Sequence, residues 1–251
     1  MIITPQIKEI LIDKMQMIQN PGKGEICLVG PVNLPVEQGD FSAVFQWYTW
    51  LELDEKVQTK EDVLESLATA NLAFAQQSSV LVYGDFKHSE QALVRMHSIC
   101  HTGDIFGSKR CDCGYQLHQS MKMITEHGCG ALFYLADHEG RGIGLFSKSL
   151  AYILQQEGLD TVEANHALGF EDDTRSYEGA IRVLEELRDK PVVLITNNPK
   201  KLEALRDHGL TANEHIPLWG GLTETNSFYL DTKIKKSGHI PQEDYIGALI
   251  K

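Results

Sequence analysis

The sequence predicts a mixed α/β fold, with an N-terminal α/β extension over residues 1–77 and a larger core over residues 78–251. From residue 78 onward, short apolar segments typical of buried strands alternate with segments of helical periodicity, a pattern that favours a sheet with some parallel pairing. The chain has 251 residues, of which 42% are hydrophobic and 23% are charged, so it can bury a sizeable core and is not disordered.

The N-terminal region combines two helical and two strand-like segments. Apolar residues recur at helical spacing over residues 6–19 and 60–76, whereas residues 25–32 and 40–53 carry the β-branched and aromatic residues typical of strands. We expect this region to form a separate lobe or an extension laid on the core.

The core is expected to alternate strands with helices. The predicted strands cover residues 78–83, 92–97, 130–135 and 191–196, and the predicted helices cover residues 114–127, 144–158, 173–188 and 199–209. Gly128 follows the first of these helices and is expected to be its C-cap, because glycine adopts the left-handed backbone of that position without strain.

The chain is acidic. With 23 basic against 35 acidic residues, its formal net charge at pH 7 is −12. Proteins that bind nucleic acid through the phosphate backbone need a basic surface, so we predict no nucleic-acid partner. The net charge does not exclude a small anionic ligand in a local basic pocket.

The N-terminal residues show no basic start followed by a long apolar run, so we expect no secretory signal. No stretch of about 18 apolar residues occurs, so we expect no membrane span. The chain contains five cysteines, an odd number that favours a reducing compartment. Together these features predict a cytoplasmic protein.

Three of the five cysteines form a compact group, in which Cys100, Cys111 and Cys113 follow a C-x10-C-x-C spacing. Thiolates bind zinc well, and three protein ligands leave a fourth position for water. The alternative is that these cysteines are small buried hydrophobic residues, but their Gly, Asp, Arg and Lys neighbours favour a metal. Cys27 and Cys129 lie in or beside apolar strands and are interpreted as core residues.

Two loops that follow predicted strands could bind an anion. Residues 139–144 (EGRGIG) and 196–201 (TNNPKK) each lie between a strand and a helix, where helix N-termini favour negative charge. Farther along, Asp173 and Arg175 lie two residues apart, and arginine can bind phosphate in a bidentate manner. The alternatives are a plain turn, a capped helix with solvated lysines and an N-cap at Asp173.

These segments, in this order, resemble the GTP cyclohydrolase II family over residues 81–240. The matching stretches read LVYGDF, VRMHSIC, TGDIFGSKRCDCGYQL, EGRGIG, AYILQQEGLDTVEANHALGF, TNNPKK and YLDTKIKKSGH. The resemblance implies that residues 78–251 form a GTP cyclohydrolase II-like catalytic domain. The synthase domain that some bifunctional relatives carry is not recognisable in the sequence.

The resemblance also implies an activity. The family hydrolyses GTP at C8 of guanine and releases formate and pyrophosphate, giving 2,5-diamino-6-(5-phosphoribosylamino)pyrimidin-4(3H)-one in the first step of riboflavin synthesis. By this resemblance the chain binds one Zn²⁺, whose bound water attacks C8, and Mg²⁺ accompanies the substrate phosphates. Family members are homodimers, so we expect a homodimer with GTP as its small-molecule substrate.

The residues of the family carry over one by one. Cys100, Cys111 and Cys113 correspond to the zinc ligands, and Tyr152, Asp173 and Arg175 correspond to the catalytic residues. The residues that correspond to GTP contacts are Arg95, Met96, His97, Ser98, Gln116, Glu139, Gly140, Arg141, Thr161, Thr196 and Lys201.

The resemblance suggests a role for several of these residues. In the family the arginine is proposed as the nucleophile at the α-phosphorus, the aspartate as its proton acceptor and the tyrosine as a positioning or acid group. Because a guanidinium is almost always protonated, an electrostatic clamp is an equally credible role for Arg175. Glu139 could accept the N1–H and N2–H of guanine, while Arg141 and Lys201 suit phosphates.

The sequence departs from the family at two places near these residues. Ile99 stands where the family commonly has an acid before the first zinc ligand, and Asp137-His138 stands where it usually has Arg-Gln. Two alternatives therefore stay open. One is a diverged paralogue that stops at the formamidopyrimidine or acts on another purine nucleotide, and the other is a nucleotide-binding protein in which zinc is structural.

Overall fold

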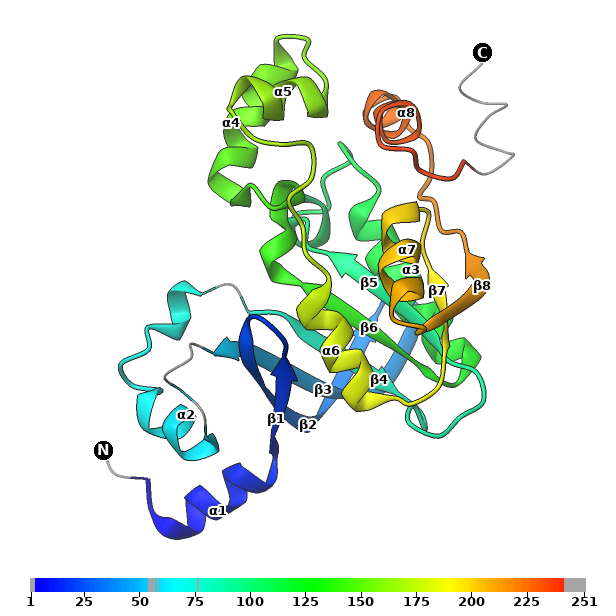
Figure 1. Ribbon diagram of the computed structural model, residues 1–251. Helices are drawn as coiled ribbons and strands as arrows, with labels where there is room; N and C mark the ends of the chain where they lie inside the picture. The colour runs from blue at the N-terminus through cyan, green and yellow to red at the C-terminus, as the bar shows by residue number, and fades with distance from the viewer. Residues whose placement is uncertain (1–2, 54–56, 58, 76, 242–251) are drawn as a thin grey trace.

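A computed structural model describes residues 3–53, 57, 59–75 and 77–241. Within these residues the chain forms a mixed α/β structure around one eight-stranded sheet with the order β1-β2-β3-β4-β6-β5-β7-β8, which confirms the predicted fold class (Figure 1). The strands are β1 (Met15–Asn20), β2 (Gly24–Gln38), β3 (Phe41–Leu53), β4 (Ser79–Tyr83), β5 (Leu93–Ser98), β6 (Gly130–Leu135), β7 (Val192–Ile195) and β8 (Thr211–Ile216).

The sheet changes character at β6. Strands β1, β2, β3, β4 and β6 pair antiparallel in that order, whereas β6, β5, β7 and β8 pair parallel, as the sequence predicts for part of the sheet. The carboxyl ends of β5, β6 and β7 therefore lie on one edge of the sheet. The loops that follow these three strands meet there, which is where ligands bind in parallel sheets.

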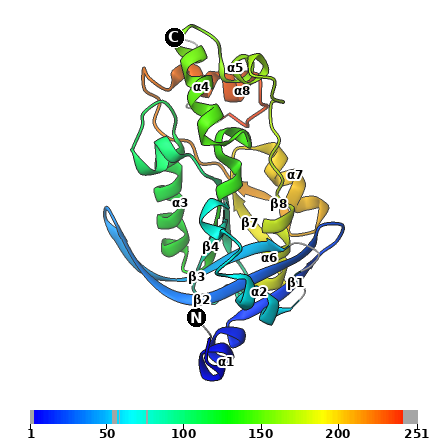
Figure 2. The same ribbon diagram turned by 90° about the vertical axis from the view of Figure 1, so that its left-hand side faces the viewer.

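Three helices cover the two faces of the sheet (Figure 2). Met121 and Ile124 of α3 pack with Phe45 and Leu132 on one face, whereas α6 and α7 contribute Leu184 and other apolar residues to a larger cluster on the opposite face. The helices are α1 (Pro5–Asp13), α2 (Lys60–Ser66), α3 (Cys113–His127), α4 (Gly144–Gln156), α5 (Thr161–Ala167), α6 (Glu178–Leu187), α7 (Pro199–Asp207) and α8 (Ser227–Lys235). Among the described residues, no helix is long and apolar enough to cross a membrane.

The N-terminal strands continue the sheet of the core. Gln46 of β3 pairs with Val82 of β4, and the buried side chains of Ile26 and Trp50 belong to the same apolar cluster as α6. The division of the chain at residue 77 stays a prediction. The helix predicted over residues 6–19 is wrong in its second half, because α1 ends at Asp13 and β1 begins at Met15. Residues 15–20 instead form a strand that pairs with β2.

Two other predicted helices are shorter than expected. Residues 60–76 contain α2 and a short 3-10 turn (Leu72–Phe74), and residue 76 lies outside the described residues. The helix predicted from residue 173 begins only at Glu178, so Asp173 and Arg175 lie in a non-helical segment. The C-cap prediction is confirmed, since Gly128 has a left-handed backbone and its N–H bonds back to the last turn of α3.

Candidate active site

The three cysteines of the C-x10-C-x-C pattern come together at the carboxyl edge of the sheet. Cys100 follows β5, and Cys111 and Cys113 lie at the start of α3, so that the three sulfur atoms are within 4.8 Å of one another. Gly103, in the π-helical turn His101–Ile105, lines this group. A Cβ atom at Gly103 would lie 2.9 Å from Cys111 Sγ and 3.1 Å from Cys100 Sγ. Three converging thiols around a glycine fit a metal that prefers sulfur ligands, such as zinc.

The cysteine thiols of this group differ in pKa. Hydrogen bonds from Cys111 and Cys113 hold the pKa of Cys100 far below its usual range, and the charge of Lys148 acts in the same direction. The bond to Cys100 raises the pKa of Cys111 to about 11. The cluster therefore places its first negative charge on Cys100, and a bound cation would displace the protons of the other two thiols.

A buried carboxylate holds the loop that carries Cys100. Asp104 Oδ2 accepts hydrogen bonds from the backbone N–H of Cys100 at 2.9 Å and from the Tyr134 hydroxyl at 3.1 Å. The same oxygen lies 3.1 Å from Nε2 of His97, whose ring stacks on that of Tyr134. Burial lowers the pKa of His97 below its usual value. These contacts fix the first cysteine against β5 and β6.

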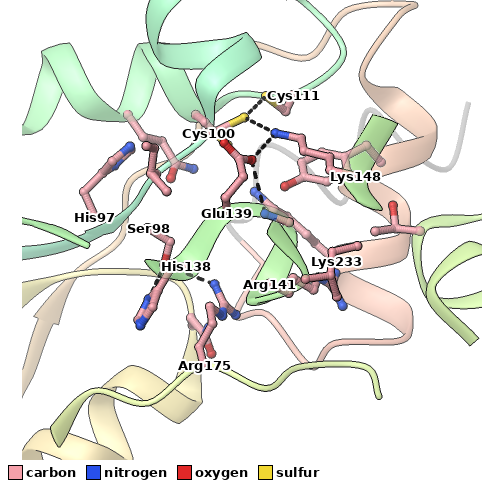
Figure 3. A pocket seen from close by; sticks show the side chains of 18 of the residues that line it. His97, Ser98, Cys100, Cys111, His138, Glu139, Arg141, Lys148, Arg175 and Lys233 are labelled. Carbon is pink, nitrogen blue, oxygen red and sulfur yellow. Dashed lines mark hydrogen bonds and ion pairs between the residues drawn. The ribbon is translucent and has the colours of Figure 1, made fainter. Parts of the chain in front are cut away.

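A pocket extends from the cysteines to the loops that follow β6 and β7, and Figure 3 shows part of it. Nearly all the predicted site residues line it. These are Arg95, His97, Ser98, Cys100, Cys111, Cys113, Gln116, Glu139, Gly140, Arg141, Tyr152, Thr161, Arg175, Thr196 and Lys201. Segments that are far apart in the sequence thus build one site.

Met96 and Asp173 are the two predicted residues that do not line the pocket. The Met96 side chain is fully buried in the core, but its backbone carbonyl accepts a hydrogen bond from Lys201 Nζ at 2.7 Å. Asp173 accepts two hydrogen bonds from Arg175, at 2.7 Å from Nε and 2.8 Å from Nη2. Both residues can therefore act on the pocket through a lining side chain.

Arg175 is held as a permanent cation. Burial alone would raise the pKa of Asp173, but the bidentate bond from Arg175 outweighs burial and lowers it to about 2. The same pair raises the pKa of Arg175 above its ordinary value despite burial. The remaining guanidinium nitrogen, Nη1, donates to Ser98 Oγ at 3.2 Å. A buried, charged and oriented guanidinium suits an electrostatic clamp on a phosphate.

The loops after β6 and β7 differ in how they present their charges. The 139–142 segment has left-handed backbone at Arg141 (φ 67°), a strained position for a residue other than glycine, and Arg141 Nη2 donates to Ser237 Oγ at 3.0 Å. In the second loop, Asn198 caps α7 and Lys201 points inward. Burial and the charges of Arg95 and Arg175 lower the pKa of Lys201 well below its usual value.

The pocket is strongly basic although the chain is acidic. Among its described lining residues, seven are Lys or Arg and only one is a carboxylate, Glu139. The seven are Arg95, Arg110, Arg141, Lys148, Arg175, Lys201 and Lys233. Buried like charges repel one another unless an anion compensates them. The arrangement therefore favours a ligand with several negative charges.

Several lining residues were not predicted from the sequence as site residues. They are His138, Lys148, Asn165, Lys233 and His239, together with neighbouring residues. Asn165 Nδ2 is buried and lacks a hydrogen-bond partner among the described residues, which makes it available to a ligand. Asn165, Lys233 and His239 lie within the resembling stretches, whereas His138 and Lys148 lie outside them and have no signal in the sequence.

The two positions at which the sequence departs from the family pattern differ in location. Ile99 lines the pocket directly beside Cys100. Asp137 is exposed outside the lining, where Ser78 Oγ lies 3.4 Å from its carboxylate, but its neighbour His138 lines the pocket.

Sequence comparison agrees with this geometry. The profile of the GTP cyclohydrolase II family matches residues 52–217, which is more than half of the chain. The chain belongs to the GTP cyclohydrolase II family. Membership of this family indicates a hydrolase.

The curated relatives are longer than the region that they share with this chain. "Riboflavin biosynthesis protein RibBA" of Bacillus velezensis is 45% identical over 190 residues, which cover 75% of this chain and 48% of the relative. The RibBA of Bacillus subtilis is 44% identical with the same coverage, and that of Bacillus mycoides is 43% identical over 189 residues, 75% of this chain and 47% of the relative. The chain thus spans about half the length of these curated relatives.

Proposed function

We propose that this GTP cyclohydrolase II family member is a zinc-dependent enzyme of riboflavin synthesis that opens GTP at guanine C8 and releases formate and pyrophosphate. The observation that carries the proposal is the convergence of three thiols and seven lysine and arginine side chains in one pocket. The thiols suit zinc, and the cations suit a triphosphate with Mg²⁺.

Cys100, Cys111 and Cys113 would hold one Zn²⁺, and Gly103 leaves the room that their sulfur atoms need. Zinc with three thiolates and an open position supplies a Lewis acid and activates water near neutral pH. Tyr152 lies next to this group, with its hydroxyl 3.3 Å from Thr102 Oγ1 and Arg110 stacked 4.3 Å from its ring centroid. Its position suits a group that orients the base or donates a proton.

The phosphates would bind to the basic side chains at the loops after β6 and β7. Arg175 would bind the α-phosphate through its charge. Asp173 would fix the orientation of the Arg175 guanidinium, and Ser98 would hold the Nη1 group of that guanidinium. Arg141 and Lys201 would bind the other phosphates. An anion beside Lys201 would favour its charged form, which its protein surroundings alone disfavour.

The guanine would bind between the cysteines and the core. Gln116 is positioned for this by two bonds, since its Oε1 accepts from Arg95 Nη2 and its Nε2 donates to Asp112, both at 2.5 Å. Glu139 Oε2 already accepts the backbone N–H of His101 at 2.7 Å, and Oε1 accepts from Lys148 at 2.5 Å. A guanine bound to Glu139 would therefore have to share these oxygens with the protein.

We also propose that the protein is a cytoplasmic homodimer. Two segments next to the pocket expose large apolar side chains that a second copy would cover: Ile105 and Phe106 after the cysteine loop, and Leu145, Phe146 and Ile153 on α4. Sedimentation equilibrium of the purified protein tests the dimer, and a monomer at micromolar concentration would contradict it.

The decisive experiment supplies the purified protein with GTP and Mg²⁺ and quantifies formate, pyrophosphate and the pyrimidine product. C111S should lose most of its zinc and its formate release, because a serine hydroxyl is a far weaker ligand. C129S is the matched control: Cys129 is also buried, but it contacts Ser89 away from the cluster. Full zinc occupancy and activity in C111S would refute the metal assignment.

R175A separates the two reactions, since it should abolish pyrophosphate release. Wild-type pyrophosphate release in R175A would show that the role given to Arg175 is wrong. Formate without pyrophosphate from the native protein would favour the diverged paralogue, and nucleotide binding without either product would favour a binding protein.

A further inference from the structure

The ammonium group of Lys148 lies between a metal-binding sulfur and a pocket carboxylate. Its Nζ donates to Glu139 Oε1 at 2.5 Å and to Cys100 Sγ at 3.2 Å (Figure 3). Lys148 comes from the second turn of α4 and is buried, with 8% of the residue exposed. A buried lysine with two anionic partners is not a solvated surface charge, so its place in the site calls for a physical role.

Glu139 and Lys148 together hold the Cys100 segment at two points. Glu139 Oε2 accepts the backbone N–H of His101, the residue after Cys100, while Lys148 contacts the sulfur itself. A Cβ atom at Gly140 would lie 3.3 Å from Lys148 Cβ, so the loop after β6 lies directly against the lysine stem. The loop after β6 therefore packs against the base of the Lys148 side chain, and the two hydrogen bonds hold its ammonium in place.

We propose that Lys148 is a positioning residue that couples the metal centre to the loop after β6. It orients Glu139 and withdraws electron density from the Cys100 thiolate. The inference rests on the proposed metal centre and deepens it. Three thiolates around a divalent cation leave one net negative charge, which weakens the cation as a Lewis acid. A charged N–H···S bond reduces what one thiolate donates, so the cation keeps more of its positive charge.

Lys233 offers a matched comparison within the same site. It is also a buried lysine, and its Nζ donates to Asp112 Oδ1 at 2.8 Å. Asp112 lies between the ligands Cys111 and Cys113 in the sequence. Lys233 thus places a similar charge near the cluster, but its hydrogen bond goes to a carboxylate and not to a sulfur. Comparing the two lysines therefore distinguishes the effect of a hydrogen bond to sulfur from the effect of a nearby positive charge.

The test replaces the resident metal of the full chain with Co²⁺ and records the sulfur-to-cobalt charge-transfer band. Loss of a hydrogen bond raises the energy of the sulfur lone pairs, so K148M should move the band to longer wavelength. K233M removes a neighbouring charge but no hydrogen bond to sulfur, so it should move the band clearly less than K148M does, and equal shifts in the two variants would refute the proposed bond.

An identical band in wild type and K148M would overturn the inference, because a merely structural lysine leaves the sulfur orbitals unchanged. If K148M does not fold, E139Q provides the second test. It removes the carboxylate that competes for the ammonium, so the band should move to shorter wavelength, and an unchanged band would again refute the proposal. A wild-type protein without thiolate-to-cobalt bands would show that the metal centre itself is wrong, and the role of Lys148 would fall with it.

Discussion

His138 should make the protein lose stability as the solution becomes mildly acidic. Its Nε2 lies 2.8 Å from the backbone carbonyl of Ser176, which only accepts, so this nitrogen carries the proton of the neutral ring. Its Nδ1 lies 3.1 Å from Ser98 Oγ, which in turn accepts from Arg175. A second proton on the ring would disrupt this chain of hydrogen bonds and add a cation near Arg175.

The size of the effect follows from the displaced pKa. Burial, reinforced by the charges of Arg175 and Lys201, lowers the pKa of His138 from 6.5 to about 4. The folded state therefore prefers the neutral ring, and the unfolded state takes up the proton first as the pH falls. The contribution to stability is complete above pH 6.5 and is lost between pH 6.5 and about 4. A displacement of this size corresponds to about 3 kcal/mol.

The variant H138Q tests this, because glutamine can replace both hydrogen bonds, does not titrate and is the residue that the family usually has here. Urea unfolding of both proteins at intervals between pH 7.5 and pH 4 gives two stability curves. Cysteine protonation and metal loss affect both proteins equally and cancel in the difference. That difference should shift by about 3 kcal/mol in favour of H138Q at low pH. Parallel curves would show that His138 is not held neutral by the fold.

Three further substitutions have defined outcomes. G103A puts a methyl group 2.9 Å from Cys111 Sγ in a backbone conformation that alanine tolerates, so zinc retention against a chelator should fall at least about tenfold. Wild-type retention would show that the cysteines do not need the space that Gly103 leaves. D173N removes the carboxylate that pairs with Arg175 and should cost about 2 kcal/mol of unfolding free energy at pH 7; the wild type loses this contribution only as the pH falls from 3.8 to about 2. Pyrophosphate release should fall more than formate release in this variant, and equal losses would count against the role of the pair. I99E should raise kcat/KM for GTP over ITP and ATP by about ten- to a hundredfold, and an unchanged preference in a stable, zinc-replete protein would show that this position does not set specificity.

The sequence predicts elements of the fold well where one physical signal dominates. Buried apolar strands such as β6 and β7 and the amphipathic helix α3 lie within a few residues of their predicted positions. The helix prediction failed at β1, because six residues with apolar spacing fit either a helix or an edge strand, and only pairing with β2 decides between them. The short elements α5 and β8 lack a comparable apolar pattern, although Asp160 and Glu163 form a capping box at the start of α5.

Site residues that belong to a sequence motif could be predicted, whereas residues that reach the pocket only through the fold could not. The cysteines and Arg175 are found by spacing and resemblance, whereas Lys148 lies on a helix whose exposed face is apolar. Phe146 is 78% exposed while Lys148 is buried, the reverse of the usual amphipathic pattern. Hydrophobic periodicity therefore predicts the wrong face for α4. The pocket below it and the surface proposed for a second copy together account for this inversion.

Helix α8 supplies the cation that pairs with a buried carboxylate beside the pocket. Asp112 is buried and lies between Cys111 and Cys113 in the sequence, and a buried carboxylate without a partner is strongly destabilising. Lys233 of α8 provides that partner, and Asp112 Oδ2 also accepts from Gln116 and lies 3.3 Å from the backbone N–H of Gly220. The cation that neutralises the cysteine loop thus comes from the last described helix, more than a hundred residues away in the sequence. The packing of α8 therefore completes one wall of the pocket and balances the buried charge of Asp112.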